Sequence, residues 1–465
     1  MLFSSPSFFA FFAVYFLFHL FVPKAYRIFL IIIGSTVFYG WWKLEYVWLP
    51  YLLTMTAYLA VLWIESTDDA LRCKRRLIAS VAILFMPLIF FKYTDFIYRD
   101  VFGPVFGLRD KVVDLPLPLG VSFITFTLTA YVVDVYRDRF KPDRSLKTVT
   151  GYVLFFPHLI AGPILRPHEL IPQLDRPRPA LSPPFTLGCA IFTMGLVKKL
   201  VFADQIAPVV DRIYALAGMP GGPEAVLAIY GFSMQIYCDF SGYTDMAIGL
   251  AILLGVRLPN NFRCPYCAVS LIDFWRRWNM TLSFWLRDYL YIPLGGNRHG
   301  TVRTCRNIIL TMVLGGLWHG ASWTFVVWGF LHGIGVSFVH LVRTHAGLAG
   351  LRRIPNWLAV LITFHFVTIA WVFFRAPTLG RALHILAAPF VANWGNVPAF
   401  LAAQVPALLL LSVFLLLHRY DDHRRIMVAV RRCSPQVIWP AMAVLWCLAI
   451  TLSQGSSAKF IYFEF

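Results

Sequence analysis

Residues 307–342 read NIILTMVLGGLWHGASWTFVVWGFLHGIGVSFVHLV, an apolar run with no Asp, Glu, Lys or Arg. As one continuous α-helix this run would be about 54 Å long, whereas the hydrocarbon core of a bilayer is only about 30 Å thick. A break is therefore required, and Gly315, Gly316 and Gly320 are the residues best able to supply it. The run predicts two membrane helices with His319 at or near the interruption between them.

The depth of His319 makes it a candidate for function. It lies thirteen positions after Arg306, which is about 20 Å of helix and places it well inside the hydrocarbon layer. An ionisable residue at that depth is a functional-site hypothesis by default. The alternative is a neutral core histidine bonded to a helix carbonyl. His332 would lie about 220° around a continuous helix from His319, so we expect His332 and His340 to be structural or near the far interface.

The whole chain has the composition of a membrane protein. Of its 465 residues 59% are hydrophobic and 14% charged, against about 25% charged in a soluble domain. We expect an all-α polytopic integral membrane protein with one domain over 1–465 and about 11–13 membrane helices, some of them broken or half-spanning. The candidate segments are 7–22, 28–42, 46–64, 77–91, 115–135, 149–163, 185–203, 224–254, 307–318, 321–342, 356–374, 405–418 and 436–453. The first is read as a membrane helix and not as a cleaved signal, because no basic leader precedes it.

Charge is distributed as a membrane topology requires. The net charge is +18, and the basic residues lie in short loops such as 65–76, 137–147 and 419–432. The positive-inside rule places these loops in the cytoplasm and both termini outside. Because the charge is explained by topology, we expect no binding of nucleic acid.

Residues 256–306 are the least membrane-like part of the chain and contain eight arginines and no lysine. The motifs FWRRW and FWLRDY predict amphipathic helices at the cytoplasmic interface. The arginines suit bidentate contacts to phosphate, while simple anchoring by Trp, Tyr and Arg explains the composition equally well.

Several familiar chemistries lack their motifs. RCPYC holds a CxxC at Cys264 and Cys267 but without the βαβ context of a redox dithiol. The sequence contains no HExxH, no phosphate-binding GxxxxGK[ST], no GxSxG, and no paired carboxylates in a membrane segment. No ligand spacing predicts a metal site.

Long motifs in order carry a resemblance that covers most of the chain. They are LPLGVSFITFTLTAYVVDVYR (117–137), FPHLIAGPILRPHELIPQL (156–174), YCDFSGYTDMAIGLAILLG (237–255), NFRCPYCAVSLIDFWRRWNMTLSFWLRDYLYIPLGGNRHG (261–300), LGGLWHGASWTFVVWGFLHG (314–333) and FIYFEF (460–465). The chain resembles the membrane-bound O-acyltransferase (MBOAT) family, in particular the bacterial branch that serves alginate O-acetylation and D-alanylation of teichoic acids.

The resemblance implies a fold with a central tunnel and identifies His319 as the signature histidine of the family. An acyl thioester would enter from the cytoplasm and an acceptor hydroxyl from outside. In the bacterial branch a second histidine is common where this chain has Asn279. If both positions line the site, His319 alone must move the proton, while the amide of Asn279 could donate to a developing oxyanion. A covalent acyl-histidine is an open variant.

The resemblance also implies donors, partners and location. We expect Trp275, Arg276, Arg277 and Arg287 to bind the donor, which would be acetyl-CoA or an acyl carrier protein thioester, with no bound cofactor. The acceptor would be an exopolysaccharide or cell-wall glycan such as alginate. We expect a periplasmic acetyltransferase as a partner. We also expect an inner-membrane location, where membrane lipid surrounds the protein and both termini lie in the periplasm. A transporter or flippase, or a non-catalytic scaffold of a polysaccharide secretion complex, is the competing hypothesis.

Overall fold

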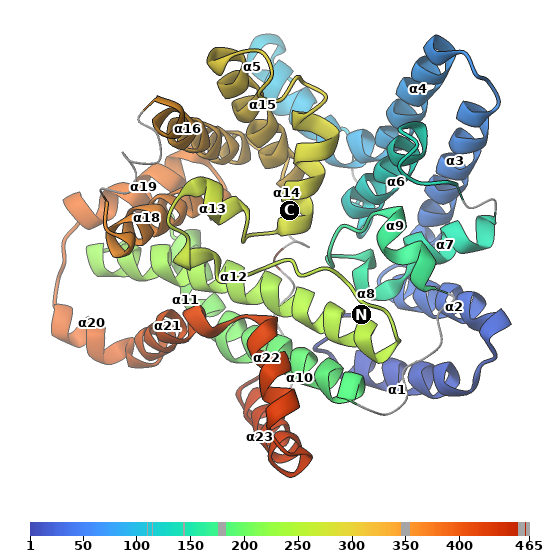
Figure 1. The fold of residues 1–465 in the computed structure, drawn as a ribbon. Helices are drawn as coiled ribbons and strands as arrows, with labels where there is room; N and C mark the ends of the chain where they lie inside the picture. The colour runs from blue at the N-terminus through green and yellow to red at the C-terminus, as the bar shows by residue number, and fades with distance from the viewer. Residues whose placement is uncertain are drawn as a thin grey trace. The chain divides into compact units, whose positions relative to one another are not determined.

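A computed structural model describes residues 1–108, 110–113, 115–142, 145–174, 183–345, 354–453 and Ile461. Most of these residues form helices, and none of them lies in a β-strand. Contacts divide the chain into two compact units, one of Met1–Phe192 with Thr244–Pro259 and one of Thr193–Tyr243 with Asn260–Phe465. The all-α class predicted from composition is confirmed (Figure 1). The expectation of one domain over 1–465 stays a prediction.

The first unit is built from short and medium helices joined by tight connections. They are α1 (Pro6–Phe21), η1 (Lys24–Tyr26), α2 (Arg27–Gly40), η2 (Leu44–Tyr46), α3 (Trp48–Glu65), α4 (Ala70–Leu88), η3 (Ile89–Tyr93), η4 (Phe96–Phe102), α5 (Gly103–Phe106), α6 (Val121–Tyr136), α7 (Leu146–Leu154), α8 (Phe156–Leu159), α9 (Pro167–Leu170) and η5 (Ile171–Gln173). Two further helices, α10 (Pro183–Val197) and α12 (Gly222–Leu253), contribute residues to both units.

Local chemistry explains how helices in this unit begin. Ser5 accepts a hydrogen bond from the backbone of Phe8, and Pro6 occupies the first turn of α1, where its missing N–H costs nothing. The carboxylate of Asp69 caps α4 in the same way. Inside the unit, nearly all of α6 is buried against α3 and α4. The first apolar run is thus a helix, as the sequence predicts.

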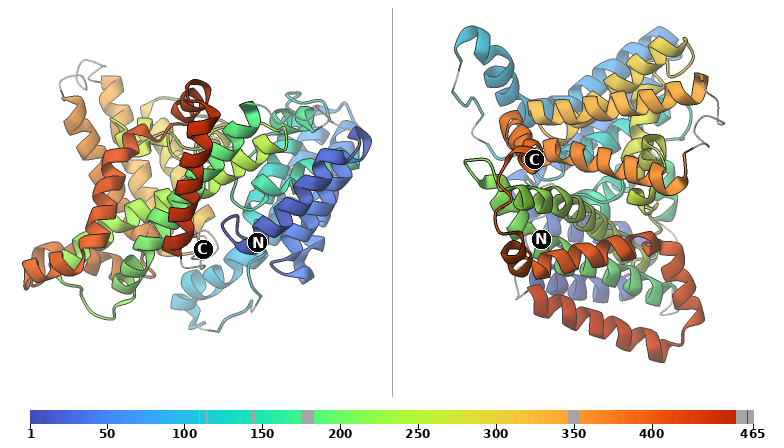
Figure 2. Two further views of the ribbon diagram at one scale, coloured as in Figure 1. Left: turned by 90° about the horizontal axis from the view of Figure 1, so that it is seen from below. Right: turned by 90° about the vertical axis from the view of Figure 1, so that its left-hand side faces the viewer.

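The second unit contains the histidine-bearing run. Its helices are η6 (Lys198–Ala203), α11 (Asp204–Ala215), η7 (Pro265–Cys267), α13 (Leu271–Trp275), α14 (Met280–Leu286), η8 (Arg287–Tyr291), α15 (Thr301–His319), α16 (Trp323–His345), α18 (Asn356–Arg375), α19 (Leu379–Val391), α20 (Val397–Ala403), α21 (Val405–Leu417), η9 (His418–Tyr420), α22 (His423–Arg432) and α23 (Pro435–Ser453). Figure 2 shows α21, α22 and α23, which follow one another in the chain, in orange-red to red.

Six helices of the described chain are long and apolar enough to cross a membrane, and a seventh span results if α20 and α21, bent by 75°, count as one. Three shorter apolar helices, α1, α6 and α19, fall below the length of a full span. A multi-pass membrane protein with broken pieces is therefore confirmed. The figure of 11–13 membrane helices, which includes such pieces, stays a prediction, as does the tunnel.

Candidate active site

The 307–342 run folds as a helical hairpin. α15 ends at His319, Gly320 follows in an extended conformation with φ −159° and ψ 146°, and α16 begins at Trp323. The predicted break is therefore confirmed and lies at Gly320. Gly315 and Gly316, which the sequence also offered as the break, lie inside α15 instead. His319 occupies the turn of the hairpin.

The glycines inside the hairpin serve close packing. A Cβ atom on Gly316 would lie 2.3 Å from the carbonyl oxygen of Phe325, and one on Gly329 would lie 2.4 Å from that of Met312. Side chains at these positions would collide with the facing backbone, so only glycine lets the two helices approach so closely. Since α15 and α16 pack along each other (Figure 1), the turn that carries His319 is held by a rigid pair of helices.

An aromatic enclosure surrounds the His319 ring, which is 4% exposed. Three rings contact it edge-to-face, with centroid distances of 4.8 Å to Trp318, 5.2 Å to Trp328 and 5.2 Å to Phe374. These contacts fix the orientation of the imidazole and exclude bulk water from it. A neutral imidazole so held can accept a proton from a hydroxyl group that reaches it.

His332, the second candidate histidine, lies closer to His319 than the sequence indicated. The prediction that His332 points away from His319 assumed a continuous helix, and the hairpin removes that assumption. Both imidazoles contact the ring of Trp328, at 5.2 and 4.8 Å. His332 is fully buried, and its Nδ1 accepts a hydrogen bond of 3.3 Å from the indole N–H of Trp275. His332 thus has a positioning partner and no exposed edge.

Asn279 is held in a strained backbone conformation at the start of α14. Its φ of 41° and ψ of 56° are left-handed, a region that asparagine tolerates better than most residues. The loop around it is tied by Asn261, which accepts bonds from the backbone of Met280 and Thr281. Asn279 is 2% exposed, and its amide nitrogen has no hydrogen-bond partner among the described residues.

Aromatic rings in contact connect the surroundings of Asn279 with those of His319. Trp278 precedes Asn279 and contacts Trp371 at 4.8 Å. Trp371 in turn contacts Trp328 at 5.6 Å and Phe374 at 5.2 Å, both neighbours of His319. One aromatic core therefore supports both predicted site residues, although no described contact joins them directly.

The predicted donor-binding residues differ in their availability. Arg277 is paired with Asp273 at 2.9 Å, and Arg287 with Asp288 at 2.6 Å. Trp275 is buried and donates to His332. Arg276 is exposed and forms no ion pair with the described residues. Of the three arginines, Arg276 is the one that has no carboxylate partner among the described residues.

Two readings of residues 256–306 can be judged from burial. Trp275, Trp278 and Trp285 are at most 8% exposed, so these tryptophans pack into the protein. The placement of residues 256–306 at the cytoplasmic interface stays a prediction. Cys264 is buried as well, and burial together with the Asp421 carboxylate raises the pKa of its thiol to about 12. A thiol of that pKa is a poor redox nucleophile, which agrees with rejecting a redox CxxC.

Sequence reasoning missed a buried ionic cluster at the consecutive lysines 198 and 199. Lys199 contacts Asp204 at 2.8 Å and Asp239 at 2.6 Å, and all three side chains are at most 7% exposed. The other oxygen of Asp239 accepts a 2.7 Å hydrogen bond from the backbone N–H of Ile461, the one residue of the FIYFEF motif inside the described residues. The carboxylates come from separate segments, so no local pairing motif reveals them. Two lysines in an apolar run were the available signal.

Known proteins are similar to this chain in sequence. A family model described as MBOAT, membrane-bound O-acyltransferase family, matches residues 90–376. The chain is 40% identical to the "Probable alginate O-acetylase AlgI" of Azotobacter vinelandii, covering 84% of this chain and 78% of the relative. It is 39% identical to the peptidoglycan O-acetyltransferase of Helicobacter pylori, covering 83% and 79%. The chain is 26% identical to the teichoic acid D-alanyltransferase of Bacillus subtilis, over 57% of this chain and 69% of the relative.

Proposed function

Because this chain belongs to the membrane-bound O-acyltransferase family, and is thus an O-acyltransferase, we propose that it moves an acetyl group from a cytoplasmic thioester to hydroxyls of an extracytoplasmic polysaccharide. Two relatives whose names specify O-acetylation of alginate and of peptidoglycan support this choice. The observation that carries the proposal is the placement of His319 at the turn of a rigid hairpin, enclosed by three aromatic rings.

In the proposed mechanism His319 is the general base. Its imidazole takes the proton of the acceptor hydroxyl as the hydroxyl oxygen attacks the thioester carbonyl. The tetrahedral intermediate then collapses, the C–S bond breaks, and the leaving thiolate recovers the proton. The unpartnered amide of Asn279 is suited to donate to the oxyanion of that intermediate.

Replacing Asn279 with glycine tests the oxyanion role. Glycine accepts the left-handed φ of 41° without strain, so this variant removes the amide with little effect on the backbone. Loss of one oxyanion donor lowers kcat by about 10²–10³-fold, and we expect a loss of this order in Asn279→Gly. Asn279→His, which restores a ring N–H donor, should recover activity. Wild-type kcat in the glycine variant, measured as ester formed per folded molecule, would refute the role.

Donor binding is proposed to use Arg276. We expect Arg276→Gln to raise the KM for acetyl-CoA roughly fivefold, as for loss of about 1 kcal/mol of an exposed charge contact, with kcat unchanged. Acetyl-3′-dephospho-CoA distinguishes a phosphate contact from a general effect, because its KM should not respond to the variant. Arg303→Gln, which removes another exposed arginine, is the charge control and should leave both KM values unchanged.

The remaining assignments are the expectations of the sequence analysis. We propose an inner-membrane location with periplasmic termini, and a periplasmic acetyltransferase that completes delivery to the glycan. The donor is acetyl-CoA, with an acyl carrier protein thioester as the second candidate.

Reconstitution tests the proposed reaction against the transporter and scaffold alternatives. The purified protein in vesicles receives acetyl-labelled acetyl-CoA on the side of the basic loops and an oligosaccharide acceptor on the other. Labelled ester on the oligosaccharide supports acyl transfer. Oligosaccharide crossing the bilayer without ester formation would instead support a transporter. Absence of both events, with periplasmic extract added on the acceptor side to supply the proposed partner acetyltransferase, would support a scaffold.

A further inference from the structure

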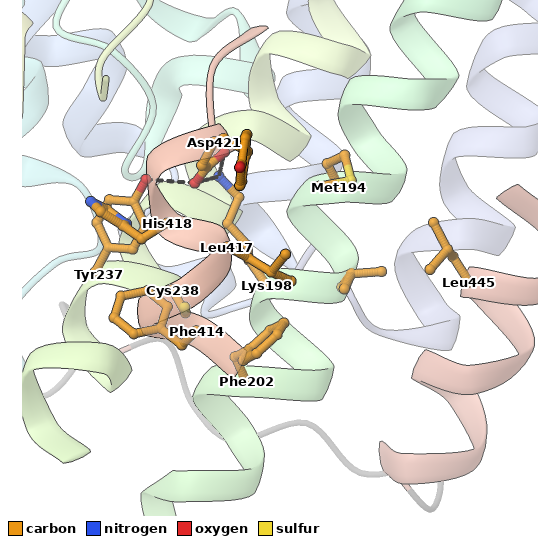
Figure 3. A pocket seen from close by; sticks show the side chains of 12 residues that line it. Met194, Lys198, Phe202, Tyr237, Cys238, Phe414, Leu417, His418, Asp421 and Leu445 are labelled. Atoms are coloured by element: carbon orange, nitrogen blue, oxygen red, sulfur yellow. Dashed lines mark hydrogen bonds and ion pairs between the residues drawn. The ribbon is translucent and has the colours of Figure 1, made fainter. Parts of the chain in front are cut away.

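A cavity of about 270 Å³ lies in the second unit, apart from the His319 enclosure. It is bordered by α10 and η6, by α12, by α21 with η9, and by α23 (Figure 3). Most of its wall is apolar, formed by Met194, Val197, Phe202, Phe414, Leu417 and Leu445. Such a wall accommodates a hydrocarbon chain, because a polar ligand group would lose its hydrogen bonds there.

The ion pair at one end of the cavity is internally neutral. The ammonium of Lys198 lies 2.8 and 3.0 Å from the two carboxylate oxygens of Asp421. The hydroxyl of Tyr237 donates to the same carboxylate at 2.5 Å, as the dashed lines in Figure 3 show. Among the described residues that line the cavity, the ammonium of Lys198 is thus matched by the carboxylate of Asp421.

His418 supplies a hydrogen-bond donor that the described protein does not use. Its Nε2 accepts a 3.1 Å bond from the backbone N–H of Tyr266, which requires a lone pair on Nε2 and therefore places the proton on Nδ1. The side chain lines the cavity and is 5% exposed. Its Nδ1 has no hydrogen-bond partner among the described residues. A buried N–H without a partner is costly, so a ligand with an uncharged acceptor would complete the site.

The rim of the cavity is strongly basic. Tyr420 lines the cavity, and the guanidinium groups of Arg419 and Arg425 lie over its ring at 4.6 and 4.7 Å. Neither of these two arginines pairs with a carboxylate of the described chain. An anionic headgroup is what this rim complements.

We propose that the cavity binds an anionic glycerophospholipid with one acyl chain inside it. The ester carbonyl of that chain accepts the Nδ1–H of His418, and the phosphate lies at Arg419 and Arg425. The rings of Tyr237, Trp278, Trp371 and Phe374 contact one another in series between this cavity and His319. In this proposal the bound lipid supports the aromatic core that encloses His319.

Two tryptophan variants on α23 test occupancy of the cavity. Leu445→Trp fills it, while Val444→Trp places the same ring on a neighbouring position that is 67% exposed. The full-length protein is purified in detergent, incubated with phosphatidylglycerol, washed, and its retained lipid counted by mass spectrometry. We expect about one retained phosphatidylglycerol in the wild type and in Val444→Trp, and at least tenfold less in Leu445→Trp. Equal retention in both variants would overturn the proposal.

Further variants and probes test the chemistry of the contact. His418→Gln keeps an acceptor for the Tyr266 N–H and has no N–H at the Nδ1 position, so retention should fall roughly fivefold, as for one hydrogen bond. His418→Asn keeps an N–H at the Nδ1 position and should retain lipid. Arg419→Gln with Arg425→Gln should abolish the preference for phosphatidylglycerol over phosphatidylcholine. Displacement by glycerol phosphate would assign the site to a headgroup alone, and stronger displacement by palmitate would assign it to a fatty acid; either result would overturn the proposal.

Discussion

Replacing His319 with alanine should lower kcat by about 10²–10⁴-fold, the usual contribution of a general base, with the protein still folded in the membrane. The side chain is enclosed by Trp318, Trp328 and Phe374, and we expect no other described group to take its place. Ester formation from labelled acetyl-CoA, divided by the amount of folded protein, is the measurement. His319→Gln, which preserves much of the volume and cannot act as a base near neutral pH, should lose activity to the same extent.

His332 provides the matched control, because it contacts the same Trp328 ring. His332→Asn keeps an oxygen acceptor for the indole N–H of Trp275, the one hydrogen bond that His332 makes in the described structure. We expect this variant to retain most of the activity per folded molecule. If it loses as much as His319→Ala, the two histidines act together and the single-base mechanism is wrong.

The parts of the fold that depend on one segment at a time could be predicted from sequence. Hydropathy alone identifies the membrane class, and span arithmetic on 307–342 requires a break, which the structure places between His319 and Trp323. These inferences use only helix rise and bilayer thickness. They do not depend on which helices pack together.

The parts that depend on pairing of segments could not be predicted in this way. The position of His332 beside Trp328 and near His319 follows from the hairpin, and the hairpin requires Gly316 to face the backbone of the other helix. Helical periodicity describes the faces of a single helix and says nothing about the partner. For the same reason the burial of the tryptophans of FWRRW could not be predicted, because it depends on contacts with α16 and α18. An amphipathic pattern cannot distinguish a face that meets lipid from one that meets another helix.

The buried cluster around Lys199 is the feature that sequence patterns predict least well. Removing its cation should have the largest effect on the free energy of unfolding. Lys199→Ala leaves the carboxylates of Asp204 and Asp239 buried with no ammonium between them. Breaking a buried pair in this way costs about 3–5 kcal/mol. We expect a loss of that size in the free energy of unfolding, measured in detergent by denaturant titration of tryptophan fluorescence.

A charge-neutral variant separates lost attraction from stranded charge. In Lys199→Met combined with Asp204→Asn and Asp239→Asn, no ion remains, so most of the stability should return. Asn at 239 still offers an acceptor to the backbone N–H of Ile461, which bonds to Asp239 in the wild type. If the triple variant is as unstable as Lys199→Ala, the wild-type cluster stabilises the fold through its specific ion pairs. Removal of the stranded negative charge alone would then not restore stability. Full stability of Lys199→Ala itself would mean that water reaches the carboxylates, since only a solvated carboxylate pair tolerates the loss of its cation.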